Sequence, residues 1–227
     1  MSFSSALFRL ADNGNSASLA SRYRAHRFRL FTGLLRACPD SPRILDVGGT
    51  AHMWVRHRDQ LPPGASVVLL NSEHVDSASN AALFHTQGDA RDLSRYADGE
   101  FDVCFSSSLI EHFPSLHEQQ TVAREIRRVA RSYFVQTPNR YFPLEPHFLF
   151  PGWQFMPLPV RTALLQRRRF GWMPRAENES QARDAVTRIR LLTRREMGEL
   201  FPDAVVTPER FGPPVRVNDF ETLRDGV

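Results

Sequence analysis

The segment Arg43-Ile44-Leu45-Asp46-Val47-Gly48-Gly49-Thr50 decides the fold. Its apolar run is short and ends in two glycines, which is typical of a buried parallel strand that enters a tight turn. Glycines let the backbone approach a ligand closely, and the carboxylate of Asp46 stands just before them. A carboxylate at that place repels a pyrophosphate and favours a ligand with a positive charge or a hydrogen-bond donor. A tight turn with a surface aspartate is the plainer alternative.

Further apolar runs follow this strand, and helical patterns separate them. The sequence predicts strands at 66–70, 83–87, 101–105, 132–136, 204–206 and 215–217, helices at 17–37, 51–60, 116–130 and 194–201, and a helical turn within 76–82. Strands that alternate with helices indicate βαβ units. We therefore expect an α/β fold with a Rossmann-like, doubly wound, mostly parallel seven-stranded sheet that binds its ligand at the carboxyl ends of the strands.

The alternation of predicted strands and helices stops after the fifth predicted strand. Residues 1–16 read as a flexible N-terminal arm and 17–227 as a single domain, in which an aromatic- and proline-rich insertion or lid occupies about 137–175. Such a loop should overhang the ligand edge, so Tyr141, Glu145 and His147 are candidate substrate contacts. Glu145 and His147 are also candidates for acid–base work, because they are titratable groups in an apolar stretch. A satellite hydrophobic cluster with two surface polar residues is the alternative.

The composition of the chain bears on which partners and which cellular compartment we expect. The chain has 29 basic residues, all arginine, against 25 acidic ones, and the net charge of +4 does not argue for nucleic acid. Two cysteines do not make a disulfide framework. The sequence shows neither a signal peptide nor an apolar stretch of about 20 residues, so we expect a cytoplasmic protein.

Three motifs in a specific order resemble those of class I S-adenosylmethionine (SAM) dependent methyltransferases, more narrowly the small-molecule type. They are Ile44-Leu45-Asp46-Val47-Gly48-Gly49, Gly88-Asp89-Ala90-Arg91-Asp92-Leu93, and Gly99-Glu100-Phe101-Asp102-Val103 followed by Ser107-Ser108-Leu109-Ile110-Glu111-His112-Phe113. The resemblance covers about residues 25–140, with a weaker echo at 190–212.

The resemblance implies a SAM site. Its members would be Asp46, Gly48, Gly49 and Thr50 at the amino acid part of SAM, Asn71 at the ribose, Asp89 and Ala90 at the adenine, and Ser106, Ser107 and Ser108 near the methionine end. Glu111 and His112 would begin the next helix close to the transferred methyl group. As alternatives, Glu111 complements the charge of a helix N-terminus and His112 is a packed, hydrogen-bonded residue.

Two departures from the family pattern keep a second function open. Thr50 and His52 stand where further glycines are usual, and Asn71 stands where an acid usually binds both ribose hydroxyls. A neutral acceptor is generally weaker than a carboxylate. A methyltransferase-like fold that has lost catalysis and serves as a binding or scaffold subunit is therefore the alternative to an enzyme.

The predicted reaction is direct displacement at the SAM methyl carbon by an acceptor that is a small molecule, a sugar or a lipid-linked compound. Enzyme residues would align donor and acceptor, with His112 or His147 as base and Glu111 beside them. No metal is expected, because no Cys/His cluster has zinc spacing.

Local sequence patterns favour or disfavour other binding partners, namely nucleic acid, a nicotinamide cofactor and a membrane. The place where base-methylating enzymes often carry Asn/Asp-Pro-Pro-Tyr/Phe reads Ser106-Ser107-Ser108-Leu109, which disfavours nucleic acid. A nicotinamide-dependent oxidoreductase is disfavoured by the missing later glycines and by Asp46. Aromatic residues next to Arg167-Arg168-Arg169 predict peripheral membrane contact through 141–170.

Overall fold

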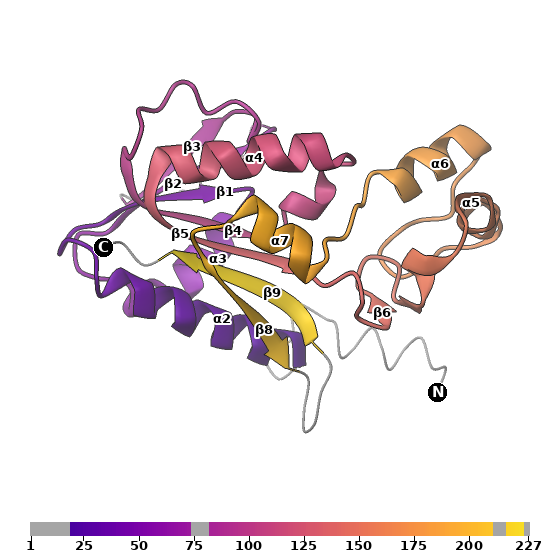
Figure 1. Ribbon diagram of the computed structural model, residues 1–227, viewed down its shortest axis with the longest axis horizontal. Helices are drawn as coiled ribbons and strands as arrows, with labels where there is room; N and C mark the ends of the chain where they lie inside the picture. Colours follow the sequence, from indigo (N-terminus) through magenta and orange to yellow (C-terminus); the bar gives the residue numbers. More distant parts are fainter. Residues whose placement is uncertain (1–18, 74–81, 211–216, 225–227) are drawn as a thin grey trace.

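The computed structural model describes residues 19–73, 82–210 and 217–224. Its main sheet contains β1 (Arg43–Val47), β2 (Ser66–Asn71), β3 (Leu83–Gln87), β4 (Phe101–Ser107), β5 (Ala130–Pro138), β8 (Val205–Arg210) and β9 (Val217–Arg224). The strand order is β3-β2-β1-β4-β5-β9-β8 (Figure 1). Strands β1 to β5 pair in parallel, and β9 is antiparallel to both β5 and β8. The predicted doubly wound, mostly parallel seven-stranded sheet is confirmed.

The chain winds outward from β1 in both directions. Strands β1, β2 and β3 lie on one side, and β4 and β5 lie on the other, so the strand order reverses between β1 and β4. A reversal of this kind leaves a crevice at the carboxyl ends of the two strands, where doubly wound folds bind ligands. The Asp46 segment lies at this edge.

Helices cover both faces of the sheet (Figure 1). They are α2 (Leu19–Leu35), α3 (Ala51–Arg56), α4 (Leu116–Val129) and α7 (Arg194–Leu200). The predicted helix 51–60 is shorter than expected, because a 3₁₀ turn at Arg58–Gln60 follows α3. Thr193 and Glu196 form a capping box at the start of α7. The predicted arm 1–16 and the turn within 76–81 lie outside the described residues.

Two hydrophobic clusters fill the space between the sheet and its helices. Apolar side chains of α4 and α7 pack with β1, β4 and β5 in one cluster, where Cys104 is fully buried. Phe28, Phe31 and Trp54 from α2 and α3 pack on the opposite face in the other. Because each cluster takes side chains from both the sheet and the helices, the strand ends are held firmly in register.

The segment between β5 and α7 is a small unit of its own at one end of the sheet (Figure 1). It contains β6 (Leu144–Glu145), β7 (Phe150–Pro151), α5 (Leu158–Arg167) and α6 (Glu179–Thr187). This unit has a hydrophobic cluster of its own, the third in the structure. Its buried members are Phe148, Trp153, Leu165, Phe170, Ala176, Ala182 and Val186. This packing continues through α6, so the unit extends beyond residue 175, the predicted end of the insertion.

The two ends of this insertion meet at the sheet. Asn139 and Leu192 form a parallel bridge, and the backbone N–H of Arg140 donates to the carbonyl of Leu192 over 2.8 Å. The chain therefore passes from the main domain into the insertion and back at neighbouring positions of the structure. Within the described ranges, no helix has the length and apolarity needed to cross a membrane.

Candidate functional site

Asp46 is the most unusual polar residue at the carboxyl end of β1. Its side chain is fully buried, and its Oδ2 accepts a hydrogen bond from Trp54 Nε1 over 2.6 Å. Among the described residues, its Oδ1 has no hydrogen-bond partner. Burial raises the pKa of Asp46 from 3.8 to about 7, although the Trp54 hydrogen bond acts to lower it. A buried acid that lacks a counter-charge suits a ligand that brings a cation.

The glycines make room for this carboxyl group. A Cβ atom on Gly49 would lie 1.6 Å from Asp46 Oδ2, so no other residue fits there without moving the acid. Gly48 has a φ of +83°, which side chains rarely adopt. The turn therefore depends on both glycines.

The residues of the two departures from the family pattern have different surroundings. Thr50 and His52 are both exposed, so neither side chain is packed into the interior of the turn. Asn71 Nδ2 donates to the carbonyl of Gly49 over 3.0 Å. Asn71 thus holds the glycine turn in place, and its amide oxygen is the atom that remains suited to accept from a ribose hydroxyl.

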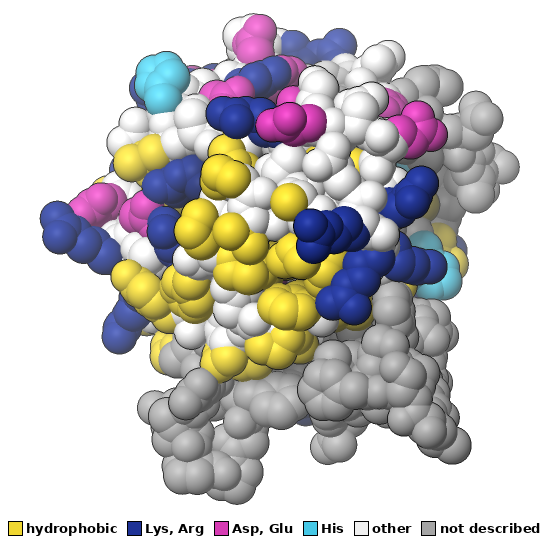
Figure 2. Space-filling model, turned by 90° about the vertical axis from the view of Figure 1, so that its right-hand side faces the viewer, with side chains coloured by type: hydrophobic (Ala, Val, Ile, Leu, Met, Phe, Trp, Pro, Cys, Tyr) yellow, Lys and Arg dark blue, Asp and Glu magenta, His cyan; other side chains and the backbone are white. Residues whose placement is uncertain are grey.

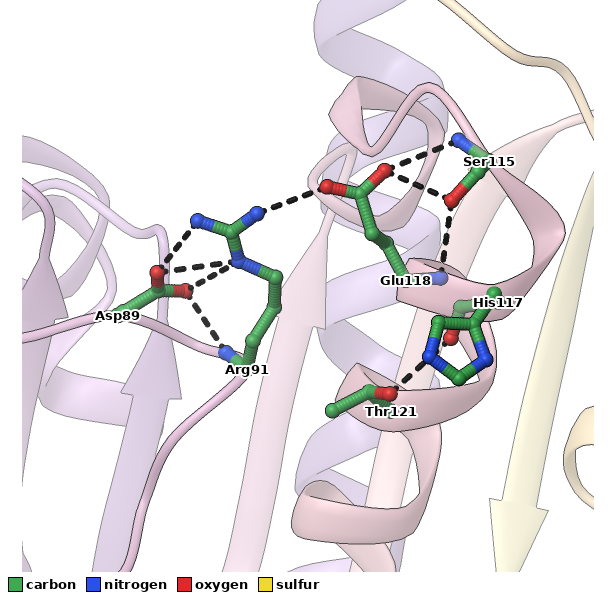
Figure 3. A network of polar contacts seen from close by, with 6 residues as sticks. All are labelled: Asp89, Arg91, Ser115, His117, Glu118 and Thr121. Carbon is green, nitrogen blue, oxygen red and sulfur yellow. Dashed lines mark hydrogen bonds and ion pairs between the residues drawn. The ribbon is translucent and has the colours of Figure 1, made fainter.

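Asp89 is engaged by a residue that sequence reasoning missed. Arg91 donates to both carboxylate oxygens of Asp89, with 2.7 Å between Nη2 and Oδ2, and reaches Glu118 over 2.8 Å (Figure 3). These hydrogen bonds from Arg91 lower the pKa of Asp89. An adenine amino group would share the carboxylate with Arg91. Ala90 is buried with Leu93 in the main cluster. The adenine roles of Asp89 and Ala90 remain predictions.

The serines at the end of β4 join neighbouring strands. Ser106 Oγ donates to the carbonyl of Val47 over 3.2 Å, and Ser107 Oγ donates to Gln136 Oε1 over 2.7 Å. Ser108 Oγ reaches the same oxygen over 3.2 Å. These hydroxyls therefore tie β4 to β1 and β5 at the ligand edge, and their predicted contact with a cofactor remains untested.

The three predicted catalytic residues come together. Glu111 and His112 lie in η2 (Ile110–His112), a 3₁₀ turn that precedes α4, rather than at the start of α4 itself. One ligating atom each of Glu111, His112 and His147 lie within 4.8 Å of one another. The two imidazole rings are nearly perpendicular, with centroids 5.1 Å apart. We call Glu111, His112 and His147 the Glu-His-His cluster.

Two members of the Glu-His-His cluster, His147 and Glu111, are each held by a neighbouring side chain. Glu145 is buried, and its Oε1 lies 2.7 Å from His147 Nδ1 while its Oε2 accepts from the backbone N–H of Phe148 over 2.7 Å. Glu111 is also buried, and its Oε2 accepts from Thr137 Oγ1 over 2.8 Å. Glu145 thus fixes His147 locally within the insertion, whereas Glu111 is fixed by Thr137 from β5, a different segment.

The two histidines have different chemistry. Desolvation, assisted by the charges of His147 and Arg188, lowers the pKa of His112 to about 4. His112 is therefore neutral and a weak base near pH 7. His147 has a carboxylate on Nδ1, an arrangement that fixes the tautomer and directs the basic lone pair of Nε2 away from Glu145.

Gln119 and Arg190 hold the cluster in position, and sequence reasoning missed both. Gln119 is fully buried and donates to the carbonyls of Ile110 and Arg190 over 3.0 and 2.9 Å. The backbone N–H of Arg190 donates to the carbonyl of Glu111 over 2.8 Å. The only sequence signal was a glutamine on the apolar face of α4.

Tyr141 belongs to a different surface. It is 66% exposed, and its ring stacks on that of Phe155 with centroids 6.4 Å apart. Of the three predicted substrate contacts, His147 belongs to the Glu-His-His cluster and Glu145 contacts it, whereas Tyr141 forms part of an exposed aromatic area.

Comparison with known proteins agrees with this geometry. Residues 45–133 match the family model described as a methyltransferase domain. The YcgJ protein from Bacillus subtilis superposes with a TM-score of 0.51 at 14% identity, over 85% of this chain and 74% of that one. A SAM-dependent methyltransferase from Aquifex aeolicus gives 0.50 at 12% identity, over 88% and 89%. No curated protein matches the chain by sequence.

The reversal of strand order at β1 and β4, the antiparallel β9 and the acidic glycine turn define a class I methyltransferase fold. The match of residues 45–133 to a methyltransferase domain agrees with this fold, and the two together indicate SAM as the cofactor.

Proposed function

We propose that the protein transfers a methyl group from SAM to a hydroxylated acceptor that is a small molecule, a sugar or a lipid-linked compound. The observation that carries this proposal is the Glu-His-His cluster, whose members Glu111 and His112 follow directly on the carboxyl end of β4. That end is paired with β1, which carries Asp46. The cluster thus gives the acceptor a polar site beside the proposed cofactor edge.

The residues at the strand ends fit SAM. Asp46 offers a buried carboxyl group to the positive charge of the methionine part, and Asn71 offers its amide oxygen to the ribose. SAM, when bound, supplies the methyl group. The chain's own contribution is to hold donor and acceptor in line, which is a large part of catalysis in reactions of this kind.

In the metal-free protein, His147 is the base that the geometry favours. Glu145 orients its ring through Nδ1, so Nε2 takes up the proton that the acceptor hydroxyl loses. His112 is a neutral neighbour that stays unprotonated near pH 7.

Calorimetry with SAM tests the cofactor and separates the enzyme from the scaffold alternative. We expect binding that is weakened in Asp46→Ala, with Asp59→Ala, an exposed acid in the 3₁₀ turn after α3, as the control. If no heat of binding appears at millimolar SAM, the enzyme function fails and the binding or scaffold function is favoured.

Methyl transfer itself is measured with radiolabelled SAM and separated polar and lipid fractions of a cell extract. The wild-type protein should label a small-molecule or lipid fraction, and His147→Gln should label it at least about a hundredfold more slowly. Equal labelling by both proteins would exclude His147 as the base. Label in the nucleic acid fraction would contradict the acceptor class.

We also propose that the insertion contacts an anionic membrane surface, where a lipid-linked acceptor would be found. Large hydrophobic side chains of the insertion are exposed: Tyr141 by 66%, Phe155 by 54%, Trp172 by 50% and Val160 by 45%. Figure 2 shows hydrophobic side chains gathered on this side of the molecule with arginines beside them. Aromatic and basic groups together are typical of surfaces that rest on anionic lipid.

Co-sedimentation with vesicles tests this contact. We expect binding to vesicles that contain phosphatidylserine and little binding to pure phosphatidylcholine. The double variant Phe155→Ser/Trp172→Ser should abolish it. Phe84→Ser, which removes a 55% exposed ring from β3 in the main domain, is the matched control. Absence of binding to either kind of vesicle would overturn the proposal.

A further inference from the structure

We propose that the Glu-His-His cluster binds a divalent transition-metal ion through Glu111, His112 and His147. This inference deepens the proposed function, since it names what holds the acceptor at that site, and it rests on that function only for the ion's role. Residue spacing alone does not predict this metal site, because His147 lies in the insertion, far along the chain from Glu111 and His112.

The geometry of the three side chains supports an ion. Their candidate ligand atoms lie within 4.8 Å of one another, and they come from two segments that the fold fixes independently. Metal–nitrogen and metal–oxygen bonds of about 2.0–2.2 Å place neighbouring ligands roughly 3–3.5 Å apart, so the side chains need to close in only slightly. Two imidazoles and one carboxylate are a common ligand set for such ions.

The surroundings of the ligands have the form that metal sites use. Glu145 Oε1 lies 2.7 Å from His147 Nδ1, so we assign Nε2 of that ring to the metal. A carboxylate behind a ligating histidine fixes the tautomer and raises the basicity of the ligand. Thr137 Oγ1 holds one oxygen of Glu111 over 2.8 Å. Second contacts of this kind orient ligands before the ion arrives.

The local charge is also suitable. Glu111 and Glu145 are buried carboxyl groups, one in the ligand set and one directly behind it, and together they can balance a divalent cation. Arg188, an exposed residue after α6, is the cationic group that acts on His112. Nitrogen ligands favour Zn²⁺, Fe²⁺, Co²⁺ or Mn²⁺ over Ca²⁺, which prefers oxygen.

Three protein ligands leave open positions on such an ion. Oxygens of the acceptor would occupy them, which orients the acceptor and lowers the pKa of a bound hydroxyl. Proton uptake and metal binding exclude each other at His147 Nε2. With His147 as a ligand, the ion would supply the acidity that activates the hydroxyl, and the released proton would go to solvent.

Cobalt titration of the full-length, tag-free protein tests the site, because Co²⁺ bound by nitrogen and oxygen ligands gives visible absorption. We expect one equivalent to bind. His147→Gln and His112→Gln should each weaken binding by about tenfold or more, and Glu145→Gln by a similar factor. His117→Gln, an exposed histidine on α4, is the control and should bind as the wild type does.

Thermal unfolding and SAM calorimetry on the same variants distinguish loss of the metal site from loss of folding or of SAM binding. A folded His147→Gln that binds SAM but not Co²⁺ supports the metal site. Failure of the wild type to bind Co²⁺, or equal binding by wild type and both histidine variants, overturns it. SAM binding without metal binding would leave the proposed function in place, whereas metal binding without SAM binding would refute the function and keep the site.

Discussion

Asp46 shows how one buried group links the fold to the cofactor. Because its pKa in the folded protein is about 7 against an ordinary 3.8, the folded protein holds this proton more tightly than the unfolded chain. The stabilisation that the proton provides is complete below about pH 4 and is lost as the pH rises to about 7. Over that window the difference amounts to at most about 4 kcal/mol.

The variant Asp46→Asn should therefore change the pH dependence of stability. Asparagine keeps an oxygen for Trp54 Nε1 but has no charge to bury. Relative to wild type, it should gain stability between pH 5 and pH 8, by as much as about 2–3 kcal/mol, as measured by urea unfolding at both pH values. Parallel curves for the two proteins would show that Asp46 does not titrate in this range.

Cofactor binding should release a proton from the same residue. The positive charge of SAM lowers the pKa of a nearby acid, so near pH 6.5 the protein should lose part of a proton when SAM binds. Calorimetry in two buffers of different ionisation enthalpy measures this release. The buffer dependence should be absent in Asp46→Asn. Equal heats for the wild type in both buffers would contradict direct contact between the acid and the cofactor.

At the scale of elements, a turn of the insertion sets the place of His147. Gly171 has a φ of +49°, and an added Cβ atom would lie 2.5–2.8 Å from backbone atoms of His147, Phe148 and Leu149. Trp172 donates its N–H to the carbonyl of His147 over 3.0 Å. The turn at Gly171 thus packs directly against the backbone of His147.

Gly171→Ala should disturb this packing. We expect a loss of about 1–3 kcal/mol in the stability of the insertion and weaker Co²⁺ binding, because His147 is displaced. Gly152→Ala is the matched control, since Gly152 also has a positive φ of +72° but has no atom within 4 Å of an added Cβ. If both variants lose the same stability and neither changes Co²⁺ binding, backbone strain alone explains the effect.

At the scale of the molecule, the insertion has a hydrophobic core that is separate from those of the sheet. It joins the main domain at the bridge between Asn139 and Leu192. A unit with its own core can open without unfolding the sheet. The Glu-His-His cluster spans both parts, because two of its members belong to η2 and one to the insertion.

Leu165→Ala should therefore loosen the insertion alone. The leucine is 1% exposed, and its truncation costs about 2–5 kcal/mol. Hydrogen exchange should become faster within 144–187 and stay unchanged in β1, β4 and β5. Leu93→Ala, a buried leucine in the main cluster, is the control and should speed exchange in the sheet. A uniform increase for Leu165→Ala would show that the two parts unfold as one.

The sequence by itself determined the strands, the parallel sheet and the acidic glycine turn. These follow from local patterns, because the period of apolar residues and the position of glycine act within a few residues. The resemblance to methyltransferase motifs named Glu111 and His112, and the titratable groups in an apolar stretch named His147. Local information overestimated the helix at 51–60, where no pattern marked the change to a 3₁₀ turn at Arg58–Gln60.

Only the tertiary structure decided what these residues form together. The buried partners Gln119, Thr137 and Trp54, and the ion pair of Arg91 with Asp89, join segments that are distant in sequence or whose spacing gave no signal. The first segment, Asp46 to Gly49, therefore fixed the fold and one edge of the site. The meeting of His147 with Glu111 and His112 depends on how the insertion folds back, because contacts between distant segments arise from packing and not from local periodicity.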